Sequence, residues 1–248
     1  MPENVSISKV FLEKLLKPVN KITENCVLRI ENTGIYCICS SIDNVILYAR
    51  CNVENDTKIS KRINLISIKK FLSGLECLGA ENDFKFEFDS NAIKCSNKTG
   101  ENEYTEFKYH LVDDSIIKEC AVDIDKISNL NFDTEFTISY QKVRQLMQGY
   151  SFATDANKIY FYTENSGVYS EINDKSLQNI DTIKIKVCDS FIGDPIETCV
   201  PISIEIFKNL TSCKSDIKVK FNKQFKVFVF QNKNFDVDLK YIVSALVK

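Results

Sequence analysis

The sequence predicts an α+β fold of two similar domains, each made from a pair of strand–helix–three-strand repeats. Four short helical patterns begin near residues 7, 67, 140 and 204, so they recur at intervals of about 60, 73 and 64 residues. Three strand-like runs separated by polar turns follow each helical pattern. An internal repeat of this length indicates a repeated structural unit more strongly than any single motif does.

Composition limits the class of protein. The chain has 248 residues, 44% of them apolar, which is enough for one large core or two ordinary cores. It contains no apolar run of about 18 residues, and its N-terminus has no basic segment followed by an apolar one. We therefore expect neither a membrane span nor a signal peptide. The ten cysteines include no Cys-x-x-Cys pair, so we interpret them as free thiols in a reducing cytosol and expect no metal site.

The first helix is expected over Ser6–Lys21. Ser6 is a suitable N-cap, and Pro18 is expected to end the helix near the preceding residue. Apolar residues recur at helical spacing on one face, at Ile7, Val10, Phe11 and Leu15. Lysines dominate the other face, where Glu13 is expected to pair locally with Lys9 or Lys17.

The rest of the first half repeats this order. A short strand at Arg62–Ile66 leads into a second helix at Ser67–Gly79, which Gly79 caps. Asn32–Gly34 is a turn signal between two of the strands. The strands after the two helices are expected at Cys26–Glu31, Ile35–Ser40, Val45–Val53, Phe84–Phe88, Ala92–Ser96 and Tyr104–Leu111.

An acidic stretch, Val112–Glu135, interrupts the pattern. It holds seven acidic residues and two lysines, which is typical of an exposed linker. We therefore predict one domain at residues 1–112, a connector at 113–134 and a second domain at 135–248.

The second half has the same order of elements. Its helices are expected at Tyr140–Tyr150 and Ser203–Lys214, and Glu164–Gly167 is a hairpin signal. Its strands are expected at Phe136–Ser139, Lys158–Thr163, Val168–Ile172, Thr182–Cys188, Thr198–Ile202, Ile217–Phe221, Phe225–Gln231 and Phe235–Ala245.

Charge is unevenly distributed. The four helical windows, residues 6–21, 66–79, 140–150 and 203–214, hold ten lysines and arginines and three glutamates, a net charge of +7. The whole chain carries −2, so the remainder carries −9. Basic helices on an acidic protein indicate a surface that faces phosphates without reading sequence. The helical aromatics Phe11, Phe71 and Phe207 lie on the apolar stripes, which favours a duplex backbone over stacked single strands. The alternative is that short helices of a lysine-rich protein simply collect lysines.

No catalytic motif is evident. The sequence has neither a GxxxxGK[ST] nor a GxGxxG loop, and His110, its only histidine, lies in an alternating strand segment. Two aspartate pairs in the connector are interpreted as solvated charge, with a weak cation site as the alternative. We therefore expect a protein that is not an enzyme and needs no cofactor.

Two segments carry a resemblance to a known family. Gly34–Leu47 (GIYCICSSIDNVIL) resembles a strand, Ser-rich turn and Val-x-Leu segment, and Leu239–Ala245 (LKYIVSA) resembles the final strand, of DNA sliding clamps. This is the family of proliferating cell nuclear antigen and the tailed-phage clamps. The resemblance implies a DNA polymerase processivity factor whose clamp domains form a ring, helices inside and sheets outside, around duplex DNA. Six domains per ring imply a homotrimer. The expected partners are duplex DNA, a DNA polymerase and a clamp-loader ATPase.

The resemblance also assigns site residues. The expected DNA-binding residues are Lys9, Lys14, Lys17, Lys69, Lys70, Lys142, Arg144, Gln145, Gln148, Lys208 and Lys214. The expected subunit interface joins the edges Tyr104–Leu111 and Thr182–Cys188, through Phe107, Tyr109, Ile183 and Ile185. The expected cleft for partner peptides beside the connector is formed by Val45, Leu47, Ile116, Ile117, Tyr241, Val243 and Ala245. The expected location is cytoplasmic, in the host if the source is a phage or another virus.

Two alternatives stay open. One is a β-rich structural or assembly protein of a virion without a DNA role. The other is a clamp relative that has lost ring closure and acts as a monomeric scaffold. The fourfold repeat and the segregated charge favour the clamp over a structural protein, which needs neither.

Overall fold

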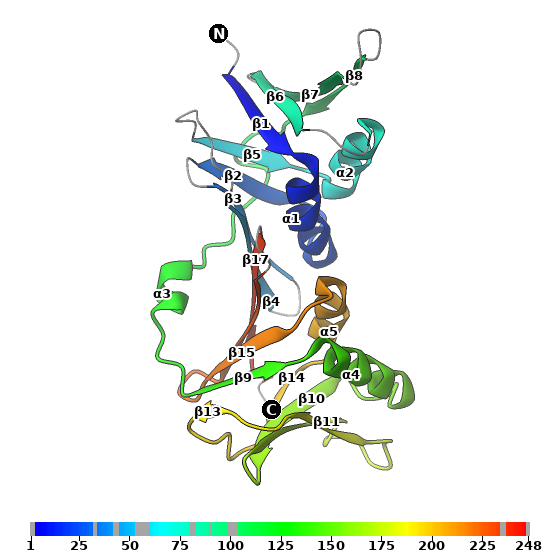
Figure 1. Cartoon of the computed structure of the whole chain (residues 1–248), viewed down its shortest axis with the longest axis vertical. Coiled ribbons are helices and arrows are strands. Elements are labelled where there is room, and N and C mark those ends of the chain that lie inside the picture. The colour runs from blue at the N-terminus through cyan, green and yellow to red at the C-terminus, as the bar shows by residue number, and fades with distance from the viewer. Residues whose placement is uncertain are drawn as a thin grey trace. The chain divides into compact units, whose positions relative to one another are not determined.

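The computed structural model describes residues 3–31, 34–41, 45–52, 60–79, 83–89, 91–98, 104–233 and 237–246 (Figure 1). The chain divides into two compact units. The first comprises Met1–Ser41, Leu47–Val122 and Lys233–Leu239, and the second comprises Ile42–Ile46, Asp123–Asn232 and Lys240–Lys248.

The first unit contains two strand–helix–three-strand repeats. Their elements are β1 (Glu3–Ser8), α1 (Lys9–Ile22), β2 (Cys26–Glu31), β3 (Gly34–Ser40), β4 (Val45–Cys51), β5 (Lys61–Leu65), α2 (Ile68–Cys77), β6 (Asp83–Asp89), β7 (Ala92–Lys98) and β8 (Tyr104–His110). The strands lie in the orders β1–β6–β7–β8 and β5–β2–β3–β4. The first strand of each repeat therefore joins the three strands of the other repeat.

The second unit follows the same scheme. Its elements are α3 (Ile124–Ser128), β9 (Thr134–Ile138), α4 (Tyr140–Phe152), β10 (Lys158–Glu164), β11 (Gly167–Asn173), β12 (Ile183–Cys188), β13 (Ile192–Gly193), β14 (Val200–Ser203), α5 (Glu205–Leu210), the 3₁₀ turn η1 (Thr211–Cys213), β15 (Ile217–Asn222), β16 (Val227–Lys233) and β17 (Val237–Ser244). Its strands lie in the orders β12–β11–β10–β14 and β13–β9–β15–β16–β17. In this unit, too, the first strand of each repeat joins the three strands of the other repeat.

α1 differs from the sequence prediction at both ends. It begins at Lys9 rather than at Ser6, because the preceding residues form β1 and pair with β6. The prediction that Pro18 ends the helix is wrong, since α1 continues to Ile22. A proline inside a helix removes one backbone hydrogen bond. The last turn nevertheless persists because Val19 is completely buried in the core.

The helices bury apolar residues that recur at helical spacing. In α2, Phe71, Leu72 and Leu75 are buried, and in α4 Val143 and Leu146 are buried. The inward face of α1 also includes two leucines that the predicted stripe omitted. Its buried residues are Leu12, Leu15, Leu16 and Val19, and the side chains of Ile7, Val10 and Phe11 lie outside the described part.

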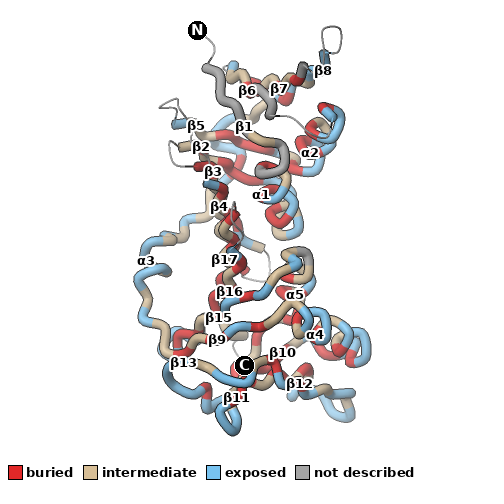
Figure 2. The backbone as a smooth tube through the Cα atoms, viewed as in Figure 1, coloured by how far each residue is buried: buried red, intermediate tan, exposed pale blue. Residues whose placement is uncertain are grey.

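Each unit has a buried core (Figure 2), and aromatic side chains make up part of it. In the first, Phe71 of α2 lies 5.2 Å from Tyr109 and 5.9 Å from Phe107, measured between ring centroids. In the second, Phe161 of β10 lies 5.5 Å from Phe228 and 6.1 Å from Phe207 of α5. These contacts hold helices and sheets together through large buried areas. None of the helices in the described ranges is long and apolar enough to cross a membrane.

Candidate functional site

The first unit exposes a row of lysines on two neighbouring helices. α1 and α2 contact one another, and their buried faces leave the lysines on the outside. Lys14, Lys17, Lys69 and Lys70 are all exposed. The side chain of Lys9 lies outside the described part of the chain. The helix pair therefore presents a cationic face.

The second unit repeats this arrangement with α4 and α5, which also contact one another. Lys142 is half-buried and donates to Gln145 at 3.0 Å. The exposed members of the predicted set in this unit are Arg144, Gln145, Gln148, Lys208 and Lys214. The sequence-predicted cations are thus brought together as two helix pairs, one in each unit.

Several of these cations have no ion-pair partner in the part of the chain that the structure describes. Lys69, Lys70 and Arg144 have no carboxylate within 4.0 Å among the described residues. Two other helix lysines are neutralised locally. Lys17 lies 2.8 Å from Glu13, as predicted, and Lys208 lies 2.6 Å from Glu205.

The lysines of strands β10 and β12 in the second unit behave differently. They project from the face opposite Phe161, which packs against α5. Each has a carboxylate partner, in the pairs Lys158–Asp174 at 2.8 Å, Lys184–Glu164 at 2.5 Å and Lys186–Asp189 at 2.7 Å, and Lys175, in the turn after β11, lies 4.0 Å from Glu171. Hydrogen bonds from Lys158 and Ser176 lower the pKa of Asp174 to about 2. This sheet face is therefore electrically balanced, whereas the helices are not.

The two strands predicted to join subunits both lie at a sheet edge, β8 in the first unit and β12 in the second. Phe107 and Ile183 are half-exposed there. Tyr109 and Ile185 are buried, and the Tyr109 hydroxyl donates to the Ser67 carbonyl at 3.2 Å. Phe107 and Ile183 are thus the members of the predicted set with side-chain surface left for another subunit.

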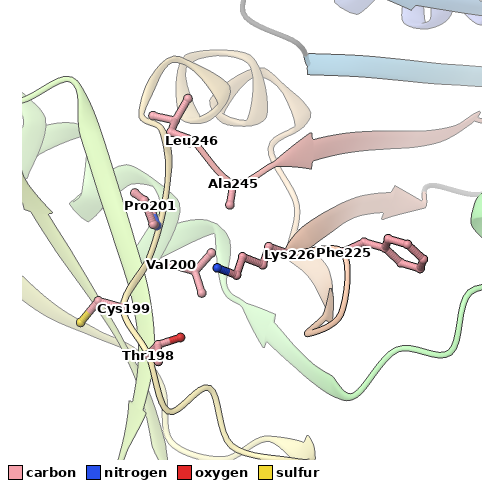
Figure 3. A pocket seen from close by; sticks show the side chains of 8 residues that line it. All are labelled: Thr198, Cys199, Val200, Pro201, Phe225, Lys226, Ala245 and Leu246. Carbon is pink, nitrogen blue, oxygen red and sulfur yellow. The ribbon is translucent and has the colours of Figure 1, made fainter. Parts of the chain in front are cut away.

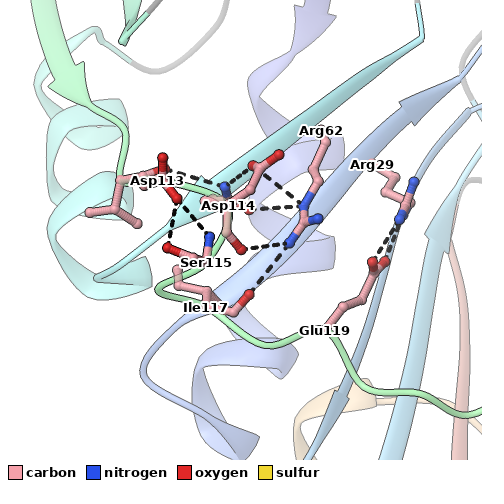
Figure 4. Close-up of polar contacts among 9 residues, drawn as sticks. Arg29, Arg62, Asp113, Asp114, Ser115, Ile117 and Glu119 are labelled. Atoms are coloured by element: carbon pink, nitrogen blue, oxygen red, sulfur yellow. Dashed lines mark hydrogen bonds and ion pairs between the residues drawn. The ribbon is translucent and has the colours of Figure 1, made fainter.

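The start of the connector is fastened to β2 and β5 by two arginines (Figure 4). Arg29 binds both Glu119 oxygens at 2.6 Å, and Arg62 reaches the carbonyls of Asp114 and Ile117 at 3.4 Å. The hydrogen bond from Arg29 lowers the pKa of Glu119. A bidentate pair of this kind fixes geometry as well as charge. It holds residues 114–119 against the sheet.

The predicted partner-peptide residues lie in different environments. Val45, Leu47, Tyr241 and Val243 are buried and present no free side-chain surface within the chain. Ile117 is buried, whereas the neighbouring Ile116 is 60% exposed. Ala245 is partly exposed and lines a hollow of about 550 Å³ in the second unit (Figure 3).

A small pocket of about 90 Å³ lies beside α3 in the second unit. Its walls are Ile127, Ser128, Phe132, Lys220, Val229, Gln231 and Lys240. Ile127 and Phe132 come from the connector, so this pocket lies beside the connector, but none of the residues predicted for the partner cleft lines it. In the sequence, the signal for this pocket is the presence of apolar residues, Ile127 and Phe132, within an acidic, linker-like stretch.

Two acidic residues of the connector accept hydrogen bonds from residues close to them in sequence. Asp113 accepts hydrogen bonds from the Ser115 amide and hydroxyl, and Asp123 caps α3 through the amides of Asp125 and Lys126. Across the described ranges, no group of three or more histidine, cysteine or acidic side chains could hold a metal ion. All ten cysteines are free thiols, and His110 is exposed at the end of β8.

Comparison with known proteins gives a result at the level of structure. No family model and no curated protein matches the chain. A solved structure of A. fulgidus PCNA, bound to the C-terminal region of FEN-1, aligns with a TM-score of 0.74, 12% identity, and coverage of 100% of this chain and 99% of that chain. Proliferating cellular nuclear antigen from Entamoeba histolytica aligns with a TM-score of 0.76, 11% identity and 98% coverage of both chains. The chain therefore has the fold of the PCNA sliding clamps, which confirms the predicted fold class.

Proposed function

We propose that this protein is a sliding clamp: a non-enzymatic processivity factor that encircles duplex DNA as a homotrimer and tethers a DNA polymerase. On a clamp fold, the observation that carries the proposal is a contrast between two sets of cations. Lys69, Lys70 and Arg144 on the helices have no carboxylate partner among the described residues, whereas the lysines of β10 and β12 are paired. A surface that meets phosphates needs unpaired cations.

Four helices carry a net positive charge on an otherwise acidic chain. α1, α2, α4 and α5 together hold nine lysines and arginines and three glutamates, a net charge of +6, so the rest of the chain carries −8. Lysines are flexible point charges that contact phosphates without fixing register. They therefore suit a protein that must hold a duplex and still move along it.

Ring closure is proposed through two of the edge strands, β8 and β12. A β8 edge and a β12 edge each offer unpaired backbone groups, and pairing them between subunits would remove both edges. Phe107 and Ile183 would add apolar contacts at the seam. Since the two edges belong to different strands, the contact is head-to-tail, and a head-to-tail contact gives a closed ring when the rotation between subunits closes.

Partner binding is proposed at the pocket beside α3. It offers Ile127, Phe132 and Val229 as apolar walls in the connector region. The C-terminal region of FEN-1 bound to A. fulgidus PCNA supports the view that a clamp of this fold takes segments of other proteins. We propose that a polymerase and a loader ATPase use this site.

A threading experiment tests the central function without a loader. The protein is incubated with linear duplex DNA biotinylated at both ends, and streptavidin is added either before or after the protein. A ring must enter over an end and is then trapped, so retention in high salt is expected only when streptavidin is added last. Equal retention in both orders, or none in either, contradicts the proposal.

A further inference from the structure

The basic helix α4 ends on an exposed aromatic ring (Figure 1). The sequence predicts that this helix ends at Tyr150, but α4 continues to Phe152. Phe152 is 60% exposed, and its ring contacts no other aromatic ring in the described part of the chain. Phe71 and Phe207, on α2 and α5, are buried as their apolar stripes predict. α4 therefore offers an aromatic ring to solvent on the same helix as cations.

The exposed ring shares one side of α4 with two polar side chains. Arg144, Gln148 and Phe152 follow one another at intervals of four residues, and all three are exposed. Residues four apart in a helix are rotated by only about 40° from one another, so the three side chains form one stripe. The Cα atoms at its two ends are separated by about 12 Å along the helix axis. The opposite side of α4 is buried.

The two polar side chains of this stripe make no contact of their own within the described residues. Arg144 has no carboxylate within 4.0 Å there, and neither its guanidinium group nor the Gln148 amide has a hydrogen-bond partner there. Lys142 and Gln145, beside the stripe, bond to each other instead. α4 also contains no acidic residue. The stripe is therefore a cation, an amide and a ring, all open to a ligand.

This combination of groups matches the chemistry of an unpaired nucleotide. A guanidinium group binds a phosphate through paired hydrogen bonds, and an aromatic ring stacks on the face of any base. A side-chain amide can bond to the edge of a base that is not paired. Inside a duplex, the faces of the bases are covered by their neighbours. A duplex would therefore use Arg144 and leave the Phe152 ring in water.

We propose that the stripe Arg144–Gln148–Phe152 binds single-stranded DNA, with a base stacked on the Phe152 ring and a phosphate on the Arg144 guanidinium group. This inference rests on the proposed function, because it extends the DNA face of α4 from the duplex to the unpaired strand that adjoins a duplex during synthesis. It differs from the duplex contact in one measurable respect, since it needs bases as well as phosphates.

The test compares two single strands that carry the same phosphates. One is a short oligothymidylate labelled with fluorescein, and the other is the same strand with abasic sites in place of its bases. Binding to the full chain at low salt is followed by fluorescence anisotropy. The unmodified protein is expected to bind the thymidine strand about tenfold more tightly than the abasic strand. Equal binding of the two strands would overturn the proposal.

Matched variants locate the preference. Phe152→Ala is expected to lower the affinity for the thymidine strand about tenfold and to leave that for the abasic strand unchanged. Arg144→Gln is expected to weaken both strands alike, because it removes a phosphate contact. Phe225→Ala removes a ring of similar exposure, 57%, in the turn between β15 and β16, and is expected to change neither affinity. A base preference that survives in Phe152→Ala, or is lost in Phe225→Ala, would contradict the assignment.

A crosslink identifies the stacked residue directly. Thymidine is replaced by 5-iododeoxyuridine, which crosslinks under ultraviolet light to an aromatic ring stacked on it, and mass spectrometry is expected to find the crosslink at Phe152. Crosslinks confined to other aromatic residues would overturn the proposal. Phe152→Ala is expected to thread onto duplex DNA normally. Threading without a base preference contradicts the stripe alone, whereas a base preference without threading contradicts the clamp function alone.

Discussion

The ring of Phe107 in edge strand β8 lies directly against Gly74 of α2, where an added Cβ would come within 2.9 Å of the ring. The second unit repeats this relationship with different residues. A Cβ at Gly149 of α4 would come within 3.0 Å of Ile183 in edge strand β12. In both units, a helix glycine therefore makes room for the half-exposed apolar side chain of the edge strand.

Gly74→Ala is expected to displace the Phe107 ring from its contact with α2 and to weaken self-association about tenfold. The helix itself gains propensity from the change, by about 1 kcal/mol, so loss of folding is not the expected cause. Sedimentation velocity over a concentration series measures the effect. Ser73→Ala, at an exposed neighbour in the same helix, is the control. Unchanged association in Gly74→Ala would show that Phe107 is not part of a seam.

Charge reversal on α4 tests the proposed DNA face. Lys142→Glu combined with Arg144→Glu is expected to lower retention on duplex DNA at least about tenfold and to flatten its salt dependence, because fewer counterions are released. Lys126→Glu combined with Lys175→Glu makes the same change in charge away from these helices. If both double variants lose retention equally, only net charge matters and the assignment of the face is wrong.

The pocket beside α3 predicts a separation of functions. Ile127→Glu places a charge in an apolar wall and is expected to abolish stimulation of a cognate polymerase while duplex threading persists. Ile116→Glu changes the other exposed end of the connector and serves as the control. A greater loss of stimulation in Ile127→Glu than in Ile116→Glu would support partner binding at the pocket beside α3. An equal or smaller loss would contradict it.

Acid stability should depend on Asp174. Its pKa is lowered to about 2 in the folded protein by Lys158 and Ser176, below the ordinary value of 3.8. A carboxylate with a depressed pKa stabilises the fold above its unfolded pKa, and this contribution disappears as the pH falls from about 4 to 2. Asp174→Asn is therefore expected to lower the Tm at pH 7 by about 3 °C and to make little difference near pH 2. A Tm difference that does not change between these pH values would contradict this assignment.

Local chemistry in the sequence predicts much of the fold. Glu164–Gly167 forms the expected hairpin between β10 and β11, with Asn165 and Ser166 at φ of +47° and +61°. The order of strands and helices follows from alternation and helical spacing. The exchange of first strands between repeats does not follow from either pattern, because it depends on which strands pair across the sheet.

In the candidate site, the positions of the cations can be predicted from the sequence, whereas their ion pairing cannot. Lysine positions on helix faces follow from periodicity, but the pairing of Lys17 with Glu13 and the isolation of Arg144 depend on which carboxylates fold nearby. The short elements β1, α3 and β13 were not predicted, because each depends on partners distant in sequence or on a cap such as Asp123. Tyr109 alternates with Phe107 along β8, yet only the fold shows that its ring belongs to the core.

Solution mass tests the account most directly, because a clamp of two-unit chains must assemble to enclose a duplex. Sedimentation equilibrium or mass photometry of the purified chain at micromolar concentration is expected to give three times the chain mass of 28.4 kDa. The Gly74→Ala variant should shift that distribution toward the single chain. A strict monomer for the unmodified protein at micromolar concentration would contradict the ring.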